Sequence, residues 1–503
     1  FNTHYIMKKI IYLFLGLLFS STLSANNLQI TNVSTVNQNE AGGYTYVQFT
    51  VSWDNSWRDA GNYDAAWIFI KYRKDGGEWA HASLGTSGVE HVAPPDAVID
   101  APSDGQGKGI FIYRNSIASG SNNFQNVQLK WNYQQNGLLS TSYVDIKVFG
   151  IEMVYVPQGS FYAGDGTSIP ANFFGQFSVT GSVAPFNITS ENAITLGGSN
   201  PAAIQNHNLS SDDFSSSTSQ ILPPNYPKGF NAVYCMKYET TQEQYVDFLN
   251  TLNQAQQRKR IKSDLIFNFD TTKQYVMTGS SNPLLNNGIR GPVPFGPEDA
   301  PLTFYCDLNY NNIPNENGDG QNIASNLNSF LDQLAYADWA ALRPMTELEY
   351  EKVCRGPVVP IPNEAAWGNA DYSQYANGVT NLGKNNETPL NGNWNFFNDL
   401  MRVGSFANSN STRFSSGASF YGIMNLSDNA SEFVISVGDA VGRGFQKTCG
   451  DGSIGLEYNV VSWPSQSGYG VKEINSVSNR SKANYFQPTV RSVYYGIRCV
   501  RTP

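Results

Sequence analysis

LRPMTELEYEKVCRG (residues 342–356) predicts the best-defined helix of the sequence. Thr346 can cap the backbone of the first turn, and Glu349, three residues later, can bond back to it, which is the spacing of a capping box. Gly356 and Pro357 follow, and they end a helix because glycine accepts a left-handed backbone and proline cannot continue the helical hydrogen bonds. We therefore expect a short helix from Thr346 to Gly356.

A second helix is predicted upstream, in MKYETTQEQYVDFLN (residues 236–250). Thr240 and Glu243 repeat the capping-box spacing. Apolar side chains then recur at the i, i+3, i+4 and i+7 positions of a helix, at Tyr245, Phe248, Leu249 and Leu252. After Pro357 the chain is irregular and rich in Asn, Gly, Ser and aromatic residues, so we expect long loops there.

Composition favours a mainly β protein with more than one domain. The 503 residues are too many for one core, so two or three domains are expected. Aromatic residues make up 13%, charged residues only 15%, and there are 45 glycines, which is typical of a loop-rich β protein and not of a helical bundle or a disordered chain. The net charge of −9 argues against nucleic acid or an anionic membrane as a partner.

Residues 1–25 have the features of a secretory signal. Met7 is followed by Lys8 and Lys9, an apolar run over residues 10–19, and small residues that end near Ala25. The run is too short for a membrane span, and no later apolar stretch approaches one. We therefore expect export to the periplasm, the cell surface or the medium, and no membrane span.

Residues 26–150 alternate between apolar and polar side chains, as β-strands do. Several short strands with regular turn signals indicate a β-sandwich domain, followed by a second domain over residues 151–503. The tryptophans in its first half favour either core packing or a sugar-stacking platform. The predicted strands cover residues 44–53, 66–72, 109–113, 127–133 and 143–149, and the tryptophans are Trp53, Trp57, Trp67 and Trp79.

Five segments, in the right order, resemble the formylglycine-generating enzyme (sulfatase-modifying factor) superfamily over about residues 151–501. Besides the two helical segments quoted above, they are MVYVPQGSFYAGD (153–165), YGIMNLSDNASEF (421–433) and YYGIRCVR (494–501); WGN (367–369) follows the segment 342–356. The resemblance implies an elaborated C-type-lectin-like fold with few regular elements and long loops. The expected fold class is therefore mainly β with α+β character, a β-sandwich followed by this lectin-like domain.

The resemblance also implies a structural calcium site at the turn 425–432. Its ligands would be the Asn425 side chain, the carbonyl groups of Asp428 and Ala430, and the Glu432 carboxylate. Calcium takes several oxygen ligands, and a turn can present carbonyls beside an amide and a carboxylate. The alternative is a hydrogen-bonded turn without metal.

A weaker calcium candidate lies in CDLNYNNIPNENGDG (residues 306–320). Asp307, Asn309 and Asn311 have the 1, 3, 5 spacing of a calcium loop. The twelfth position is Gly318 and not glutamate, so a solvated Asn/Gly loop is the competing interpretation.

The chemistry of the superfamily is missing from this chain. Its oxidases bind copper and oxygen through two neighbouring cysteines, and the corresponding stretch, residues 476–495, has none. Its iron-dependent relatives need a histidine cluster, and His207 is the one histidine of the second domain. We therefore expect neither copper nor iron. The cysteines are predicted to be buried small side chains with one or two disulfides among them; they are Cys235, Cys306, Cys354, Cys449 and Cys499.

The segment 442–495 concentrates Tyr, Asn, Ser, Gly and Arg without a period. This composition is typical of adaptable binding surfaces and resembles the variable region of diversified lectin-fold proteins, although ordinary polar loops are the alternative. The candidate ligand-binding residues are Arg443, Trp463, Tyr469, Asn475, Arg480, Asn484, Tyr485, Arg491 and Tyr494.

The sequence thus favours an exported, non-catalytic binding protein for a glycan or a surface-protein ligand. Two alternatives stay open. One is an enzyme of the formylglycine-generating or nonheme-iron superfamily with another chemistry, and the other is a structural component of a cell-surface or motility assembly.

Overall fold

The computed structural model describes residues 27–167, 175–206, 211–262, 272, 274–292, 300–395, 399–474 and 476–503. Strands account for 31% of the chain and helices for 10%, which confirms the mainly β class. The expected secretory signal lies outside the described residues. Within them no helix is long and apolar enough to cross a membrane.

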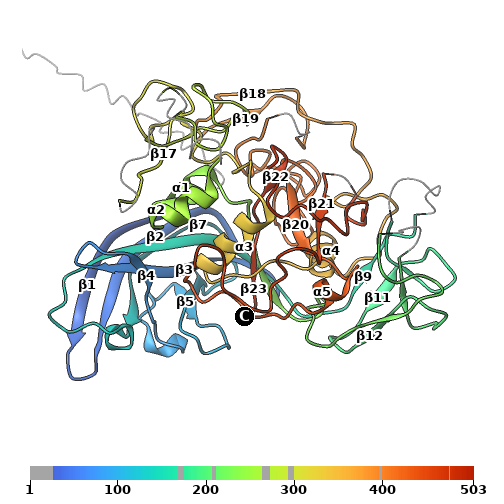
Figure 1. Cartoon of the computed structure of the whole chain (residues 1–503), viewed down its shortest axis with the longest axis horizontal. Coiled ribbons are helices and arrows are strands. Elements are labelled where there is room, and N and C mark those ends of the chain that lie inside the picture. Colours follow the sequence, from blue (N-terminus) through green and yellow to red (C-terminus); the bar gives the residue numbers. More distant parts are fainter. Residues whose placement is uncertain are drawn as a thin grey trace, which may run out of the picture.

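One large sheet runs through both halves of the molecule (Figure 1). It has ten strands. The strands that match the sequence prediction are those formed by residues before position 157. Its main path is β1 (Gln29–Asn39), β2 (Tyr44–Arg58), β3 (Tyr63–Lys74), β8 (Val144–Val156), β15 (Val233–Met236) and β23 (Val500–Arg501). Off this path, β7 (Ala118–Trp131) pairs with β2, β4 (Trp79–His81) and β6 (Ile110–Arg114) pair with β3, and β5 (Ala97–Asp100) pairs with β6.

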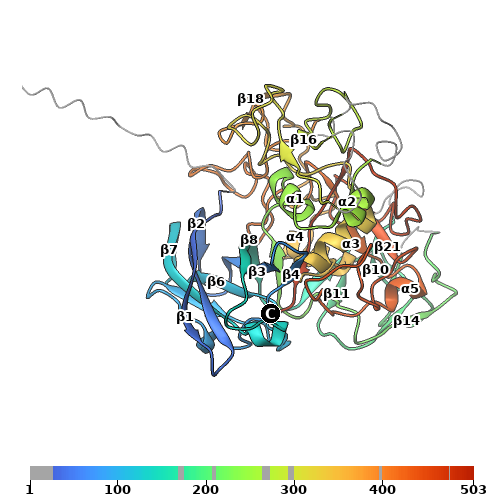
Figure 2. The same ribbon diagram turned by 60° about the vertical axis from the view of Figure 1, so that its left-hand side comes forward.

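The first strands of this sheet fold over to form two packed layers (Figure 2). β2 and β3 are paired only at Arg58 and Tyr63, beside their connecting turn, so the two strands diverge into different layers. In β2 every second side chain is buried, as expected for a strand with one face in a core. Val47 and Phe49 of β2 belong to the same buried cluster as Ile68 of β3.

The layer that contains β3 is buried on both faces. Nine consecutive residues of β3 are buried, a pattern that β-strands show when both sheet faces are covered. Trp67 and Phe69 point away from the first core and belong to the cluster that includes helix α3 (Phe330–Trp339). The layer that contains β3 is therefore the middle layer of a larger structure.

Strand β8 joins the two predicted domains. It pairs with β3 from Val144 to Tyr155, and its end, from Met153 to Val156, also pairs with β15. The boundary that we expected between residues 150 and 151 lies inside this strand.

Polar contacts across the layers add to this continuity. The indole nitrogen of Trp67 donates to the carbonyl of Ala340 at 2.9 Å. Lys71 donates to the carbonyl of Trp339 at 2.8 Å. Both side chains are buried, so the C-terminal region supplies the partners that these donors need.

The remainder of the chain consists of short elements joined by long loops, as the resemblance implies. The helices are α1 (Gln242–Leu249), α2 (Gln254–Arg260), α3, α4 (Glu347–Arg355) and α5 (Ala440–Arg443). The strands outside the large sheet are β9 (Phe161–Ala163), β10 (Ser178–Val179), β11 (Phe186–Ile188), β12 (Ile194–Leu196), β13 (Ile204–Gln205), β14 (Gln220–Leu222), β16 (Ile289–Arg290), β17 (Tyr305–Cys306), β18 (Val379–Thr380), β19 (Thr388–Pro389), β20 (Ser431–Ile435), β21 (Tyr469–Lys472) and β22 (Tyr495–Gly496).

Helix α4 has the predicted cap, whereas α1 begins one residue later than predicted. Thr346 and Glu349 form the capping box of α4. In α1 the box is formed by Thr241 and Gln244, so the prediction of Thr240 and Glu243 is wrong. The physical reason is that the backbone N–H of Thr240 donates to the carbonyl of Ile497 at 2.8 Å. Glu243 is therefore not used in capping.

Candidate functional site

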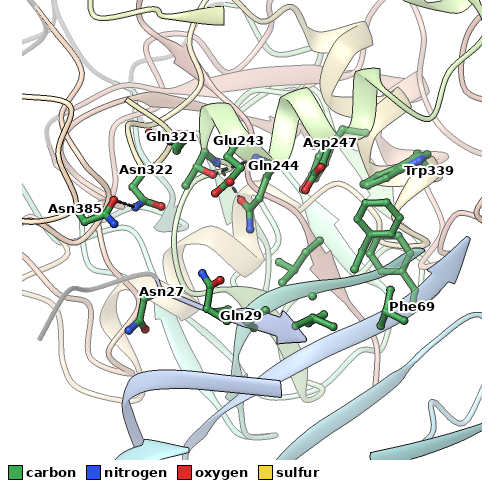
Figure 3. Close-up of a pocket in the computed structure, with 18 residues that line it drawn as sticks. Asn27, Gln29, Phe69, Glu243, Gln244, Asp247, Gln321, Asn322, Trp339 and Asn385 are labelled. Atoms are coloured by element: carbon green, nitrogen blue, oxygen red, sulfur yellow. Dashed lines mark hydrogen bonds between the residues drawn. The ribbon is translucent and has the colours of Figure 1, made fainter. Parts of the chain in front are cut away.

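A cavity of about 470 Å³ lies between helix α1 and the edge of the large sheet (Figure 3). We call it the α1 cleft. Strands β1 and β8 supply the floor, and the loops around Asn322 and Asn385 supply one rim. Glu243, Gln244 and Asp247 project from α1 toward the strands. The α1 cleft therefore forms where the first layers of the sheet meet the C-terminal region.

The two carboxylates of the α1 cleft lack a counter-ion. Glu243 and Asp247 are four residues apart, so they are neighbours on one face of α1. Neither side chain makes a hydrogen bond or an ion pair with a described residue. Burial raises the pKa of both carboxyls, and it raises that of Asp247, with help from the charge of Glu243, to about 6. Asp247 is half-buried and Glu243 is exposed, so two unpaired negative charges lie side by side on the wall of an open cavity.

One end of the α1 cleft is aromatic. The ring of Trp339 meets the rings of Phe69 and Phe149 edge to face, with centroids 5.1 Å apart in both pairs. The indole nitrogen of Trp339 donates to the hydroxyl of Thr251 at 2.8 Å, which fixes the orientation of the ring. These contacts make a rigid apolar wall beside the carboxylates.

Our sequence prediction did not single out these two acids. It assigned Glu243 to the helix cap, and it gave Asp247 no role. A usable signal was present, because residues 239–251 contain no Lys or Arg that could pair with either acid on the helix surface.

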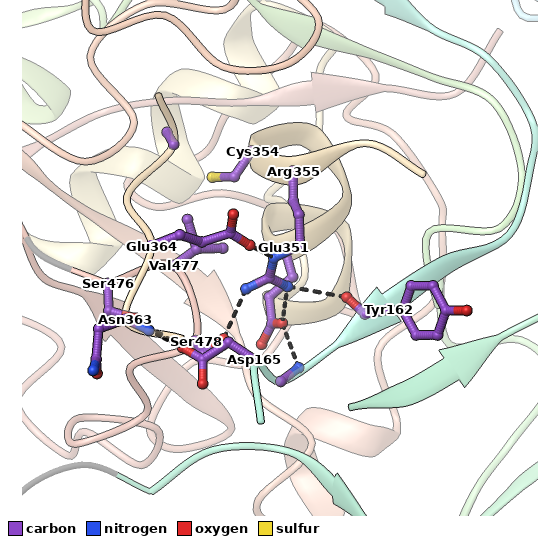
Figure 4. A network of polar contacts seen from close by, with 12 residues as sticks. Tyr162, Asp165, Glu351, Cys354, Arg355, Asn363, Glu364, Ser476, Val477 and Ser478 are labelled. Atoms are coloured by element: carbon purple, nitrogen blue, oxygen red, sulfur yellow. Dashed lines mark hydrogen bonds and ion pairs between the residues drawn. The ribbon is translucent and has the colours of Figure 1, made fainter. Parts of the chain in front are cut away.

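A polar network around Arg355 includes the beginning of the stretch 476–495, which we expected to correspond to the family's cysteine pair (Figure 4). Arg355, at the end of α4, is fully buried. Its guanidinium donates to Ser478 at 2.7 Å, to Glu351 at 2.7 Å and to Glu364 at 2.5 Å. It also donates to the carbonyl of Tyr162 at 3.0 Å. One side chain thus joins α4 to three separate segments.

Neighbouring contacts close the network. Ser476 donates to Asp165 at 3.3 Å, and the same carboxylate oxygen accepts the backbone N–H of Asn363 at 3.0 Å. The N–H of Gly164 donates to Glu351 at 2.7 Å. Both serines are therefore held by the fold through hydrogen bonds.

The cysteines are free, and four of them are buried. Burial raises the pKa of Cys235 to about 12 and also raises the pKa of Cys306, Cys354 and Cys499. A thiolate is the reactive form and the metal ligand, so these thiols favour the unreactive state. Cys449 is half-buried and has no disulfide partner, so the predicted disulfides do not form.

The expected calcium turn gathers three buried polar side chains. Asn425 donates its amide to Asp428 at 3.1 Å. Glu432 accepts from Arg498 at 2.5 Å, whereas its second oxygen is buried and has no partner among the described residues. The backbone N–H of Ala430 donates to Glu239, a carboxylate that the sequence prediction did not include, at 2.8 Å.

The charges in this turn are not balanced. Three buried carboxylates, of Glu239, Asp428 and Glu432, face one guanidinium, that of Arg498. Burial raises the pKa of Asp428 to about 7 and that of Glu432 to about 7. The open Glu432 oxygen and the excess of negative charge fit a calcium ion. Among the described residues no three Asp, Glu, His or Cys side chains converge as a metal site, so carbonyl groups would supply most of the ligands.

In the second calcium candidate, an arginine and hydrogen bonds already engage the three predicted residues. Asp307 is buried and accepts from Arg290. Asn309 donates to Glu316 at 2.9 Å, and Asn311 donates to the same carboxylate. Asp307 is thus paired with an arginine, and the two asparagines organise the loop through hydrogen bonds.

Two arginines that we predicted to bind ligand are structural. Arg480 is buried and donates to Asp212 and to Glu347, at 2.7 Å in each case. Arg443 is buried and donates through both terminal nitrogens to Asp213, at 2.7 Å each. The prediction for these two residues is wrong, because buried ion pairs already use their donors.

Two predicted aromatic anchors are also in the interior. Tyr469 is fully buried and stacks on Phe330 with ring centroids 3.8 Å apart. Trp463 is 4% exposed, and its indole nitrogen donates to the carbonyl of Thr448 at 3.0 Å. Neither ring is available to a ligand in this structure, so this part of the prediction is corrected as well.

The remaining candidates lie nearer the surface. Tyr494 is exposed, whereas Asn484, Tyr485 and Arg491 are half-buried. Arg491 donates to Asp332 at 3.0 Å, and Asn484 donates to a backbone carbonyl. Asn475 lies outside the described residues. The structure leaves only this reduced set for contact with a ligand.

The capped α4, the turn at 425–432 and the closing strand β23 are the parts of a formylglycine-generating type of domain. Residues 147–503, more than half of the chain, match the family described as the sulfatase-modifying factor enzyme 1-like domain. The chain therefore belongs to this family, which confirms the resemblance seen in the sequence. A search of curated proteins found no match.

Proposed function

We propose that the protein is an exported, non-catalytic ligand-binding protein in which the sulfatase-modifying-factor domain serves as a rigid framework. The network around Arg355 carries this proposal. Ser476 and Ser478 are both hydrogen-bonded in it, and they belong to the stretch that the resemblance assigns to the copper-binding thiol pair of the family's oxidases.

The state of the cysteines supports the same conclusion. Copper(I) selects soft thiolate ligands, and burial favours the protonated form of four of the five thiols. Cys449 stands alone as the half-buried thiol. Oxidation of a substrate cysteine through a thiolate pair has no residues to support it here.

Calcium at the turn 425–432 belongs to this proposal as a structural ion. It would neutralise the excess of buried carboxylates and would bind the open oxygen of Glu432. Its role is to hold the loops beside β20, and it takes no part in a reaction.

A copper and oxidase assay tests the absence of thiol chemistry. The full chain is titrated with Cu(I) and then incubated with oxygen and a cysteine-containing peptide. We expect no high-affinity copper site and no aldehyde on the peptide. The variant Cys449→Ser serves as the control for adventitious copper binding. Stoichiometric tight copper binding together with aldehyde formation would overturn the proposal.

A further inference from the structure

We propose that the α1 cleft binds a small organic cation, an ammonium or guanidinium group carried on an apolar body. This inference rests on the binding function proposed above and names the class of ligand. It also places the site away from the C-terminal loops, at the junction between the first layers of the sheet and helix α1.

The charge of the cleft selects a cation. Glu243 and Asp247 both face the cavity, and neither carboxylate is paired with a described residue. No Lys, Arg or His is among the described residues that line it. An anion would meet two negative groups and no positive one, whereas a cation would relieve the repulsion between neighbouring carboxylates on the helix.

The nearest basic side chains are already engaged elsewhere. The charge of Lys147 reaches Asp247 only through space, and its ammonium group lies over the ring of Trp79, 5.2 Å from the centroid. Lys71 is buried, its ammonium group lies over the rings of Phe69 and Trp339, and it donates to the carbonyl of Trp339. Neither lysine lines the cavity, so the protein itself does not neutralise the two acids at this site.

The walls of the cleft favour an organic cation over a hydrated metal ion. Phe149 and Trp339 form one end, beside the fully buried Phe69, and Leu28, just before β1, and Ile30 of β1 contribute apolar surface to the floor. The exposed edges of Phe149 and Trp339 can bury the hydrocarbon part of a ligand. A metal ion would gain nothing from this apolar surface.

The size of the cavity fits a small molecule. Its volume of about 470 Å³ lies within the range of small-molecule sites, roughly 300–1,000 Å³. Amide side chains at the rim, from Gln29, Gln244 and Asn322, can orient additional polar groups of the ligand. Most of the exposed lining is polar, so the acids and amides would contact the charged and polar groups of the ligand, and the aromatic end would hold its apolar part.

Calorimetric titration of the full chain, in the presence of a chelator, tests this inference. The probe is 2-phenylethylammonium, with 2-phenylethanol as the neutral analogue and 3-phenylpropionate as the anionic one. We expect the cation to bind and both analogues to bind at least about tenfold more weakly. The reason is that the attraction between two opposite unit charges about 4 Å apart, in a partly buried site, is large enough to change an affinity tenfold.

Isosteric variants locate the binding. Asp247→Asn and Glu243→Gln should each weaken binding of the cation about tenfold. Asp96→Asn removes the same charge from an exposed position and should leave the affinity unchanged. Equal binding of the neutral analogue, no binding of the cation, or an unchanged affinity in both α1 variants would overturn the inference. Binding of the anion alone would refute this ligand class while leaving a binding function in place. The copper and oxidase assay tests separately the other part of the proposed function, the absence of thiol chemistry.

Discussion

Replacing Asp247 by asparagine should stabilise the protein, and the gain should depend on pH. The substitution keeps the shape of the side chain and removes its charge. Burial, with a smaller contribution from the charge of Glu243, raises the pKa of Asp247 from 3.8 to about 6. A shift of this size corresponds to about 3 kcal/mol against the ionised folded state. Because the side chain opens onto the α1 cleft, water screens part of this cost, and we expect about 1–2 kcal/mol.

The sign follows from proton binding. The folded state holds the Asp247 proton more tightly than the unfolded state, so this carboxyl contributes stability below pH 3.8 that is lost as the pH rises through about 6. The amide of the asparagine variant does not titrate and would have no such dependence. The difference in the free energy of unfolding between variant and wild-type protein should therefore reach its maximum at pH 7.5 and be small at pH 4.

Urea denaturation at several pH values measures this difference in the free energy of unfolding. Asp96→Asn, at an exposed position, is the matched control and should change stability little at any pH. The reasoning is refuted if Asp247→Asn destabilises the protein at pH 7.5, or if its effect is the same at pH 4 and pH 7.5. Combined with the titration above, the expected result is a variant that is more stable and binds less well, as is common for residues kept for function.

Three further predictions concern the framework. Trp67→Phe should lower the free energy of unfolding by about 2–4 kcal/mol, because it leaves the buried carbonyl of Ala340 unpaired and opens a cavity. Two separate unfolding transitions, with only one of them shifted, would contradict the conclusion that both regions share one sheet layer. A thiol reagent should react quickly with only Cys449 in the native protein and with all five cysteines after denaturation. Rapid reaction of two or more cysteines in the native protein would contradict the burial of the other four. Chelation should lower the melting temperature and Ca²⁺ should restore it, since a ligand of the folded state stabilises it; an unchanged melting curve in metal-free protein would count against the site at Glu432.

Local patterns explain the parts of the fold that the sequence predicts well. The cap of α4 depends on residues three positions apart, and Gly356 ends the helix with a positive φ of 69°. Alternating side chains identified β2, because one of its faces is in a core. At α1 two overlapping pairs fit the same capping pattern, and only the distant contact of Thr240 with Ile497 decides between them.

Long-range pairing explains the errors at the candidate site. The partners of Arg480 are Asp212 and Glu347, which lie far away in the sequence. A segment that is rich in Tyr, Asn and Arg and has no helical or strand periodicity is expected in exposed loops. The same composition is equally expected where buried ion pairs hold a loop-rich core together. Composition alone cannot distinguish the two, so the predicted binding surface included interior residues.

The position of strand β23 has a consequence for the kinetics of folding. Arg501 pairs with Tyr234 in the same sheet that contains the earliest strands, and its side chain donates to Asp104 at 2.6 Å. The first strands can therefore pair locally soon after synthesis, but the middle layer is not covered until the distant strand arrives. Contacts of such long sequence separation slow folding and prolong the exposure of apolar strands. We expect this protein to depend on chaperones until its last strand has docked.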